Sequence, residues 1–288
     1  MEKIKGKLLV FLIIAFSFCQ ENHPHPPLEL VTIPTAGTLP RGSFTLESLL
    51  AKDGGIIPRL AIGFTDNFTL GVSFGIQKFI GDEEFLVNRT KPEVQIKYRI
   101  FEETTDMPAI VYGIDTQGRG GYLETRTVKS IMTSYADENS ENYEIGDLIV
   151  EEIVSEIDVN RYEQKAWGMY LSLSKNYNFF GNLGLHVGAN KNYWEISDGD
   201  KDVNFFIGLD KELNRSFSLL LDYDSALNDN DYEFEELSFG RGKGYLNAGV
   251  RWTIASNLLI ELNLNNFNKN SEAKYINRQI KIIYSDSF

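Results

Sequence analysis

The sequence predicts an all-β fold, an antiparallel up-and-down barrel of about 12 strands. Three observations lead to this prediction. In many segments apolar residues recur at every second position, and charged residues occupy the positions between them. Short and long connections alternate along the chain. Residues 42–288 carry all three features.

The clearest run spans residues 68–76, where Phe68, Leu70 and Val72 alternate with small or polar residues. Alternate side chains of a strand point to opposite faces, so one face of this run is apolar. The same rhythm predicts strands at residues 44–50, 60–64, 68–76, 94–100, 110–114, 167–173, 183–189, 203–209, 217–223, 246–254, 258–264 and 280–288.

A β-sandwich alternates in the same way, so the charges decide between the two folds. Charged residues on the alternate faces must meet water or one another, whereas the apolar faces lack them. Arg or Lys costs roughly 2–4 kcal/mol at mid-depth on a lipid-facing surface. We therefore expect a transmembrane β-barrel with an apolar exterior. The candidates for lining its lumen are Arg59, Glu93, Lys97, Arg99, Asp115, His186, Asp210, Asp222, Asp224, Arg251, Glu261 and Lys281.

The connections alternate in length. Those near residues 66–67, 104–106, 176–180, 212–215 and 255–257 are short, and most of the others are long and polar. Outer-membrane barrels have short periplasmic turns and long extracellular loops. An even number of strands places both ends of the barrel on the short-turn side.

One turn allows a test of register. Pairing Ile254 with Leu258 across residues 255–257 keeps both on the outer face and sets Arg251 directly opposite Glu261 in the lumen. Opposite charges facing each other across a strand pair contribute roughly 0.2–1 kcal/mol.

The N-terminus has the pattern of a secretory signal, with three Lys before an apolar run at residues 8–18. Ala15 and Ser17 suit a cut before Phe18, so residues 1–17 form the signal peptide. The alternative is a lipoprotein signal that acylates Cys19. Residues 18–41 are rich in Pro and predict an extended periplasmic leader. Its two His residues, 23 and 25, are too few for a firm metal site.

Residues 118–164 predict a long extracellular loop that is acidic from residue 137 onward. One hypothesis is a divalent-cation site, and the other is a solvated surface loop. Calcium requires six to eight clustered oxygens, and the EF-hand spacing is not found here.

Composition argues against several kinds of partner and site. The formal charge of −13 argues against a nucleic-acid partner, because phosphate binding needs a basic face. The single Cys excludes an intramolecular disulfide framework. We expect no cofactor and no bound metal.

The sequence offers little catalytic chemistry. His186 lies on the inward face beside Ser172 or Ser174, and we interpret it as a hydrogen-bonded wall residue. The Gly-Arg-Gly-Lys-Gly motif at residues 240–244 lacks P-loop spacing. We therefore predict no catalytic residues and no enzyme.

Two resemblances add to this reading. The terminal Phe288, at the end of an alternating strand, resembles the assembly signal of bacterial outer-membrane proteins, although Asp286 interrupts the pattern. This implies the outer membrane of a diderm bacterium and its barrel-assembly machinery. Ile33-Pro34-Thr35-Ala36, followed by Pro40 and Gly42, resembles the start of YjbH-like barrels linked to exopolysaccharide production. That likeness implies a surface-polysaccharide export system as a partner.

Three functions stay open. The first is a narrow channel or export pore for ions, small polar solutes or polysaccharide-related cargo, in contact with outer-membrane lipid and lipopolysaccharide. The second is a non-conducting structural or assembly barrel with a salt-bridged lumen. The third, least favoured, is a barrel hydrolase.

Overall fold

The computed structural model describes residues 27–135, 148–230, 240, 242–270 and 276–288. Its elements are β1 (Ser43–Leu50), η1 (Lys52–Gly54), β2 (Ile56–Thr65), β3 (Phe68–Ser73), β4 (Ile76–Gln77), β5 (Leu86–Val87), β6 (Glu93–Phe101), β7 (Ala109–Asp115), β8 (Arg119–Tyr135), β9 (Leu148–Gln164), β10 (Gly168–Asn178), β11 (Asn182–Lys191), β12 (Asn204–Glu212), β13 (Phe217–Asp224), η2 (Leu227–Asp229), β14 (Tyr245–Ala255), β15 (Leu258–Asn265) and β16 (Asn277–Ser287). The helices η1 and η2 are single 3-10 turns.

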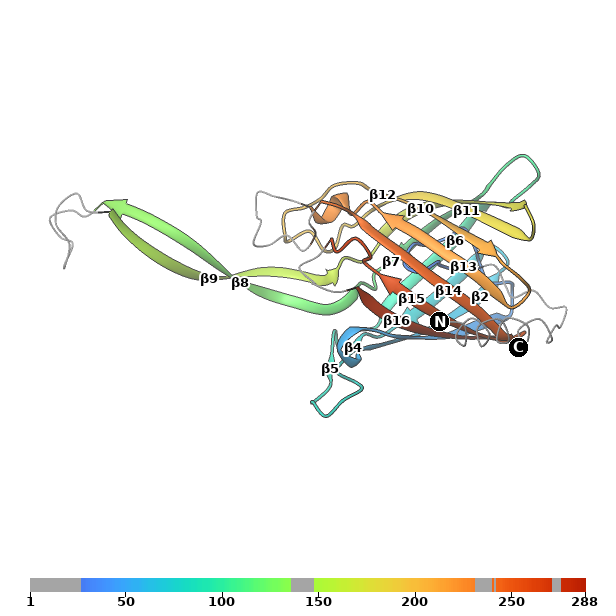
Figure 1. The fold of residues 1–288 in the computed structure, drawn as a ribbon, viewed down its shortest axis with the longest axis horizontal. Coiled ribbons are helices and arrows are strands. Elements are labelled where there is room, and N and C mark those ends of the chain that lie inside the picture. The colour runs from blue at the N-terminus through green and yellow to red at the C-terminus, as the bar shows by residue number, and fades with distance from the viewer. Residues whose placement is uncertain (1–26, 136–147, 231–239, 241, 271–275) are drawn as a thin grey trace, which may run out of the picture.

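Twelve of these strands close into one antiparallel barrel (Figure 1). The order around it is β1, β16, β15, β14, β13, β12, β11, β10, β7, β6, β3 and β2, and β2 pairs with β1 to complete the circle. Closure gives each strand a neighbour on both sides and removes the open edge of a sheet. The prediction of a 12-stranded antiparallel barrel is confirmed.

Alternation sorts the side chains between the two surfaces of the wall. On β12, Phe205 and Ile207 are 56% and 58% exposed, whereas Phe206 and Asp210 are buried. Large apolar residues are exposed in the same way on most barrel strands, including Leu46, Val72, Tyr112, Leu171, Val187, Leu221, Val250, Leu262 and Ile282. The exterior is therefore apolar, while most buried polar side chains face inward.

Two details of the predicted pattern are wrong. Ala255, not Ile254, pairs with Leu258, because a bulge between residues 253 and 255 shortens the turn. The alternation over residues 167–173 predicts an outward-facing Trp167, yet this side chain is buried and precedes β10. Gly168 follows it with φ of +68°, a conformation that breaks the strand alternation at this point.

The long connection between β7 and β10 carries a hairpin of its own. Among the described residues, strands β8 and β9 pair only with each other, and they project far beyond one end of the barrel (Figure 1). We call this the long-loop end. The C-terminus lies at the opposite, short-turn end. Within the described residues, no helix is long and apolar enough to span a membrane.

Candidate functional site

Residues 28–40, which we call the lumen segment, lie inside the barrel. They form a narrow hairpin in which Glu29 bridges to Pro34, and the amide of Leu30 donates to the carbonyl of Ile33 at 2.9 Å. Leu30 and Ile33 are fully buried. The segment returns to the wall near the β2–β3 turn, where Leu39 N donates to Thr69 Oγ1 at 2.9 Å, and continues into β1.

The tip of the hairpin is held at Thr32. Its backbone amide and hydroxyl donate to the two carboxylate oxygens of Asp222, at 2.9 and 3.0 Å. Asn247 Nδ2 donates to the Thr32 hydroxyl at 2.9 Å, and the indole of Trp167 donates to the Thr32 carbonyl at 3.1 Å. Three wall strands or their ends thus bind one residue of the lumen segment.

Both arms of the hairpin are held by Lys97 on β6. Its ammonium group donates to the carbonyls of Leu28, Thr35 and Gly37, the last two at 3.1 and 3.3 Å. A buried carbonyl without a strand partner must find another donor, and an ammonium group has three hydrogens to give. Lys97 therefore supplies hydrogen-bond donors to carbonyls of this segment, as a neighbouring strand does in a sheet.

Two serines of β10 bind the returning arm. Ser172 Oγ donates to the carbonyl of Pro34 at 3.0 Å, and Ala36 N donates to Ser174 Oγ at 2.8 Å.

Glu29 is the charged centre of the lumen segment. Its carboxylate lies 2.7 Å from Lys281 Nζ, 3.1 Å from an Arg59 nitrogen and 3.8 Å from an Arg119 nitrogen. Two cations of the wall, and Arg119 at the start of β8, thus converge on one acidic side chain. A buried carboxylate is tolerated only with such partners.

The wall extends this network. Arg251 and Glu261 face each other across β14 and β15, and a guanidinium nitrogen of Arg251 lies 2.6 Å from Glu261 Oε1. The predicted pairing of these residues is confirmed. Lys281 lies 3.3 Å from the other oxygen of Glu261, which joins this pair to Glu29.

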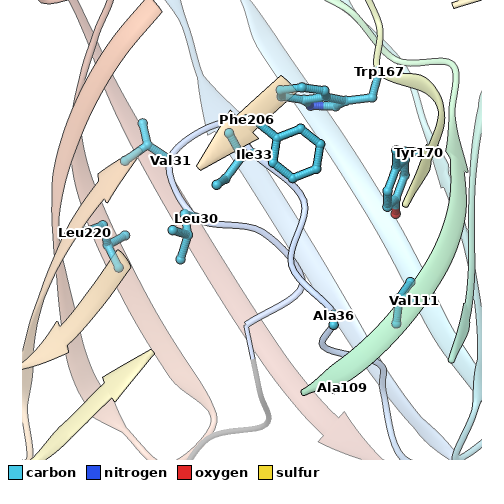
Figure 2. Packing of buried hydrophobic residues seen from close by; sticks show 10 residues of the cluster. All are labelled: Leu30, Val31, Ile33, Ala36, Ala109, Val111, Trp167, Tyr170, Phe206 and Leu220. Atoms are coloured by element: carbon cyan, nitrogen blue, oxygen red, sulfur yellow. The ribbon is translucent and has the colours of Figure 1, made fainter. Parts of the chain in front are cut away.

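An apolar cluster completes the contact between segment and wall (Figure 2). Leu30, Val31, Ile33 and Ala36 of the lumen segment lie among inward-facing wall residues. Those wall residues are Ala109, Val111, Trp167, Tyr170, Phe206 and Leu220. Burying such side chains away from water is favourable at roughly 25 cal/mol per Å² of apolar surface.

The expectation of an extended leader outside the barrel is wrong for residues 28–40. The leader contains apolar residues that gain more from the lumen than from solvent, and the polar wall satisfies its backbone. Residues 1–26, with the predicted signal peptide, Cys19 and the two His, lie outside the described residues.

All 12 predicted lumen residues lie on barrel strands, and the structure gathers them into groups. Arg59, Asp115, Arg251, Glu261 and Lys281 surround Glu29, with Arg59 3.6 Å from Asp115. Lys97 and Asp222 bind the lumen segment directly.

The other predicted residues lie nearer the ends or in a separate cluster. Asp224 accepts from Asn204 at 2.6 Å, and Glu93 accepts from the Tyr162 hydroxyl at 2.9 Å. Arg99 donates to the carbonyl of Asp66 in the β2–β3 turn at 2.6 Å. His186 and Asp210 are hydrogen-bonded to each other at 2.8 Å.

A cavity of about 670 Å³ opens at the short-turn end of the lumen. It is bordered by Pro27 and by the arm of the lumen segment at residues 35–37. Its wall includes Arg99, Ser174, His186, Asp210 and Arg251.

At the long-loop end, three loops meet around Arg161 of β9. The guanidinium group lies 2.6 Å from Asp198 in the β11–β12 loop and 2.8 Å from Asp229 in η2. Lys165 also binds Asp198, at 2.7 Å. The sequence alone does not reveal this cluster, because the three loops are far apart in the chain and only the fold brings them together.

Glu195 lies beside this cluster. Its carboxylate accepts the backbone amides of Tyr162 and Ala166 at 2.9 and 2.7 Å and the side-chain amide of Asn192 at 2.7 Å. Burial raises the pKa of Glu195 to about 7, while these hydrogen bonds and Arg161 act in the opposite direction.

Within the described residues, no group of three or more His, Cys, Asp or Glu is arranged to hold a metal ion. The hypothesis of a cation site in the acidic loop falls partly on residues 136–147, which lie outside the described residues.

Comparison with known proteins gives a likeness of fold alone. No protein-family model matches the chain, and no curated protein matches it. The chain is similar to the NanC porin, at 11% identity and a TM-score of 0.40, over 85% of this chain and 99% of that one. It is also similar to the outer-membrane protein Omp33 of Acinetobacter baumannii, at 9% identity and a TM-score of 0.39, over 85% and 97% of the two chains. A third similar structure is the translocator domain of the autotransporter NalP from Neisseria meningitidis, at 10% identity and a TM-score of 0.33, over 85% and 86%.

Proposed function

We propose that the protein is an outer-membrane channel whose lumen is closed, in this conformation, by its own lumen segment. The observation that carries the proposal is the hairpin at residues 28–40, which is held across a polar lumen by Asp222, Lys97 and the cations around Glu29. Displacing this hairpin would leave a passage lined by both signs of charge, which is the kind of lining that selects ions and polar solutes.

The exterior supports a membrane location. Soluble proteins rarely expose large contiguous apolar patches, yet aromatic and aliphatic side chains are exposed around this barrel. We propose that they contact outer-membrane lipid and, on the outer leaflet, lipopolysaccharide. Phe288 is 87% exposed at the short-turn end, where barrel-assembly machinery would reach it.

The way the segment is bound favours a removable closure. Many of its contacts with the wall are hydrogen bonds and ion pairs made by side chains. In the part of the chain that the structure describes, no barrel strand pairs with the segment as a ladder. When the segment leaves, water can enter and solvate both partners of each ion pair, and this solvation offsets much of the lost attraction. Because the segment shares no ladder with the barrel strands, moving it leaves the 12 strand pairings intact.

The experiment locks the segment to the wall. A β-carbon built on Gly249 would lie 3.0 Å from Val31 Cγ2, close to the separation of about 3 Å between a sulfur and the opposite β-carbon of a disulfide. Only the flexible end of Asn263 must move to admit it. We would introduce Val31→Cys and Gly249→Cys to form the disulfide, and Cys19→Ser to remove the native thiol. The same chain carries Glu29→Lys, which sets a cation against Arg59 and Lys281 and so favours release of the segment.

We expect Glu29→Lys alone to raise conductance in planar bilayers several-fold. The disulfide should abolish that conductance and a reductant should restore it. The control that carries Glu29→Lys and Val31→Cys without Gly249→Cys should conduct under both conditions. If the folded Glu29→Lys barrel stays silent, the second function, a non-conducting structural barrel with a salt-bridged lumen, is favoured.

The cargo is a further proposal. Residues 33–36, which resemble the start of YjbH-like barrels, lie in the returning arm of the lumen segment. We propose a polysaccharide-related cargo as the finer version of the channel function. Deleting the gene should then reduce surface polysaccharide, and unchanged polysaccharide would leave ions or small polar solutes as the cargo.

A further inference from the structure

Three side chains at the short-turn cavity form a connected chain of hydrogen bonds. Ser174 Oγ lies 2.7 Å from His186 Nδ1, and His186 Nε2 lies 2.8 Å from Asp210 Oδ1. All three line the cavity of about 670 Å³. A hydroxyl, an imidazole and a carboxylate in this order are the components of an activated serine nucleophile.

The strand register builds this arrangement. Ser174 on β10 stands directly opposite His186 on β11, and Asp210 on β12 is the diagonal neighbour of His186. Glycine makes the last contact possible. A β-carbon on Gly184 would lie 2.2 Å from Asp210 Oδ1 and 2.9 Å from His186 Nε2, so any larger residue there would separate the two.

The roles follow from the partners. The carboxylate of Asp210 accepts, so Nε2 of His186 carries a hydrogen and Nδ1 is left to accept the hydroxyl hydrogen of Ser174. The backbone amide of Ala36 donates to Ser174 Oγ at 2.8 Å and helps to fix the position of the hydroxyl. The base and the carboxylate orienter thus both stand within hydrogen-bond reach.

We propose that Ser174, His186 and Asp210 form an esterase site that takes carboxylic esters small enough for the short-turn cavity. This inference does not rest on the barrel being a channel. It names candidate catalytic residues for a barrel hydrolase, the function that the sequence favours least. Ser174 and His186 are the catalytic residues, and Asp210 is a positioning residue.

The reaction balances with water as the only co-reactant. Ser174 Oγ attacks the ester carbonyl carbon while its proton passes to His186 Nδ1, and the alcohol leaves with that proton as the carbon–oxygen bond breaks. Water then attacks the acyl-serine and gives a proton to His186. Ser174 takes that proton back as the carboxylic acid is released.

The test uses the full refolded barrel and a fluorophosphonate probe, which reacts with activated serines. We expect labelling at Ser174, located by mass spectrometry of the digested protein, and its loss after heat denaturation. Ser218 lines the same cavity from β13, so Ser218→Ala is the matched control and should label as the wild type does.

Hydrolysis of p-nitrophenyl acetate gives the second readout. Ser174→Ala and His186→Ala should each lower its rate at least 100-fold in barrels that keep heat-modifiable migration. Asp210→Asn should lower the rate and shift the pH profile, which a purely structural role would not do. If His186→Ala fails to fold, Ser174→Cys provides an alternative test. Its thiol, activated by His186, should react with iodoacetamide faster than the thiol of Ser218→Cys.

A folded wild-type barrel without probe at Ser174 would overturn the proposal. So would hydrolysis that persists unchanged in folded Ser174→Ala.

Discussion

Lys281 of the last strand and Glu29 of the lumen segment form an ion pair with 2.7 Å between Nζ and Oε1, although 252 residues separate them in the chain. Both side chains are largely shielded from water. The pair fixes the N-terminal hairpin against the wall at the point where Glu261 and Arg251 extend the charge network. Loss of this ion pair should therefore weaken the charge network of the lumen as a whole.

We predict that Glu29→Gln lowers the free energy of unfolding by about 3 kcal/mol, because removing one partner leaves buried cations without a full counter-charge. Urea titration followed by the fraction of compact barrel on unheated gels would measure this. Glu83→Gln is the control, since its pair with Lys78 is exposed and should matter little. Equal effects of the two variants would refute a special role for Glu29.

Depth in the membrane gives a second prediction. Ile207 and Leu213 are 58% and 60% exposed, but Ile207 lies within β12 and Leu213 lies in the turn that follows it. Ile207→Arg should destabilise the inserted barrel by roughly 2–4 kcal/mol, and Leu213→Arg should have a much smaller effect. The yield of heat-modifiable barrel in lipid vesicles measures both. Equal tolerance would argue against a lipid-facing exterior.

The loop-end cluster should control the root of the β8–β9 hairpin. Arg161 is 1% exposed and binds acidic residues of two other loops, so Arg161→Met should leave Asp198 and Asp229 with less compensation and loosen all three loops. We expect faster cleavage by added protease in the loops than in the wild type. Arg89→Met is the control, because Arg89 is partly exposed beside Glu93. Cleavage at the wild-type rate would contradict the prediction.

The raised pKa of Glu195 predicts a pH dependence. Because its pKa rises from the ordinary 4.5 to about 7 on folding, the folded protein binds more proton between these values. The contribution of Glu195 to stability is then full below about pH 4.5, falls as the pH rises toward 7, and is constant above that. Glu195→Gln should remove this slope from urea titrations, whereas Glu156→Gln, on an exposed part of β9, should retain it. Identical slopes in wild type and Glu195→Gln would exclude this origin.

Local periodicity was enough to predict the wall. Alternation along each run gave 12 strands, and the short turn after β14 gave the Arg251–Glu261 pair despite the unforeseen bulge at Ile254. Such features depend on residues close together in sequence or on directly neighbouring strands. The wall of a barrel is built almost entirely from contacts of this kind.

The lumen segment depends on contacts of another kind. Thr32 meets Asp222 and Asn247 across separations of 190 and 215 residues, which no periodicity reveals. A signal was nevertheless present in the sequence. Phe206 and Leu220 fall on the inward positions of their strands, and apolar side chains there are favourable only if something apolar fills the lumen.

The ion pair between Glu29 and Lys281 also has a consequence for the order of folding. The hairpin that leads the barrel finds one of its main partners on the last strand to be synthesised, and the seam between β1 and β16 joins the same two regions. Closing so long a loop is entropically costly and tends to be slow. The first part of the barrel to emerge during synthesis is therefore among the last to reach its final place.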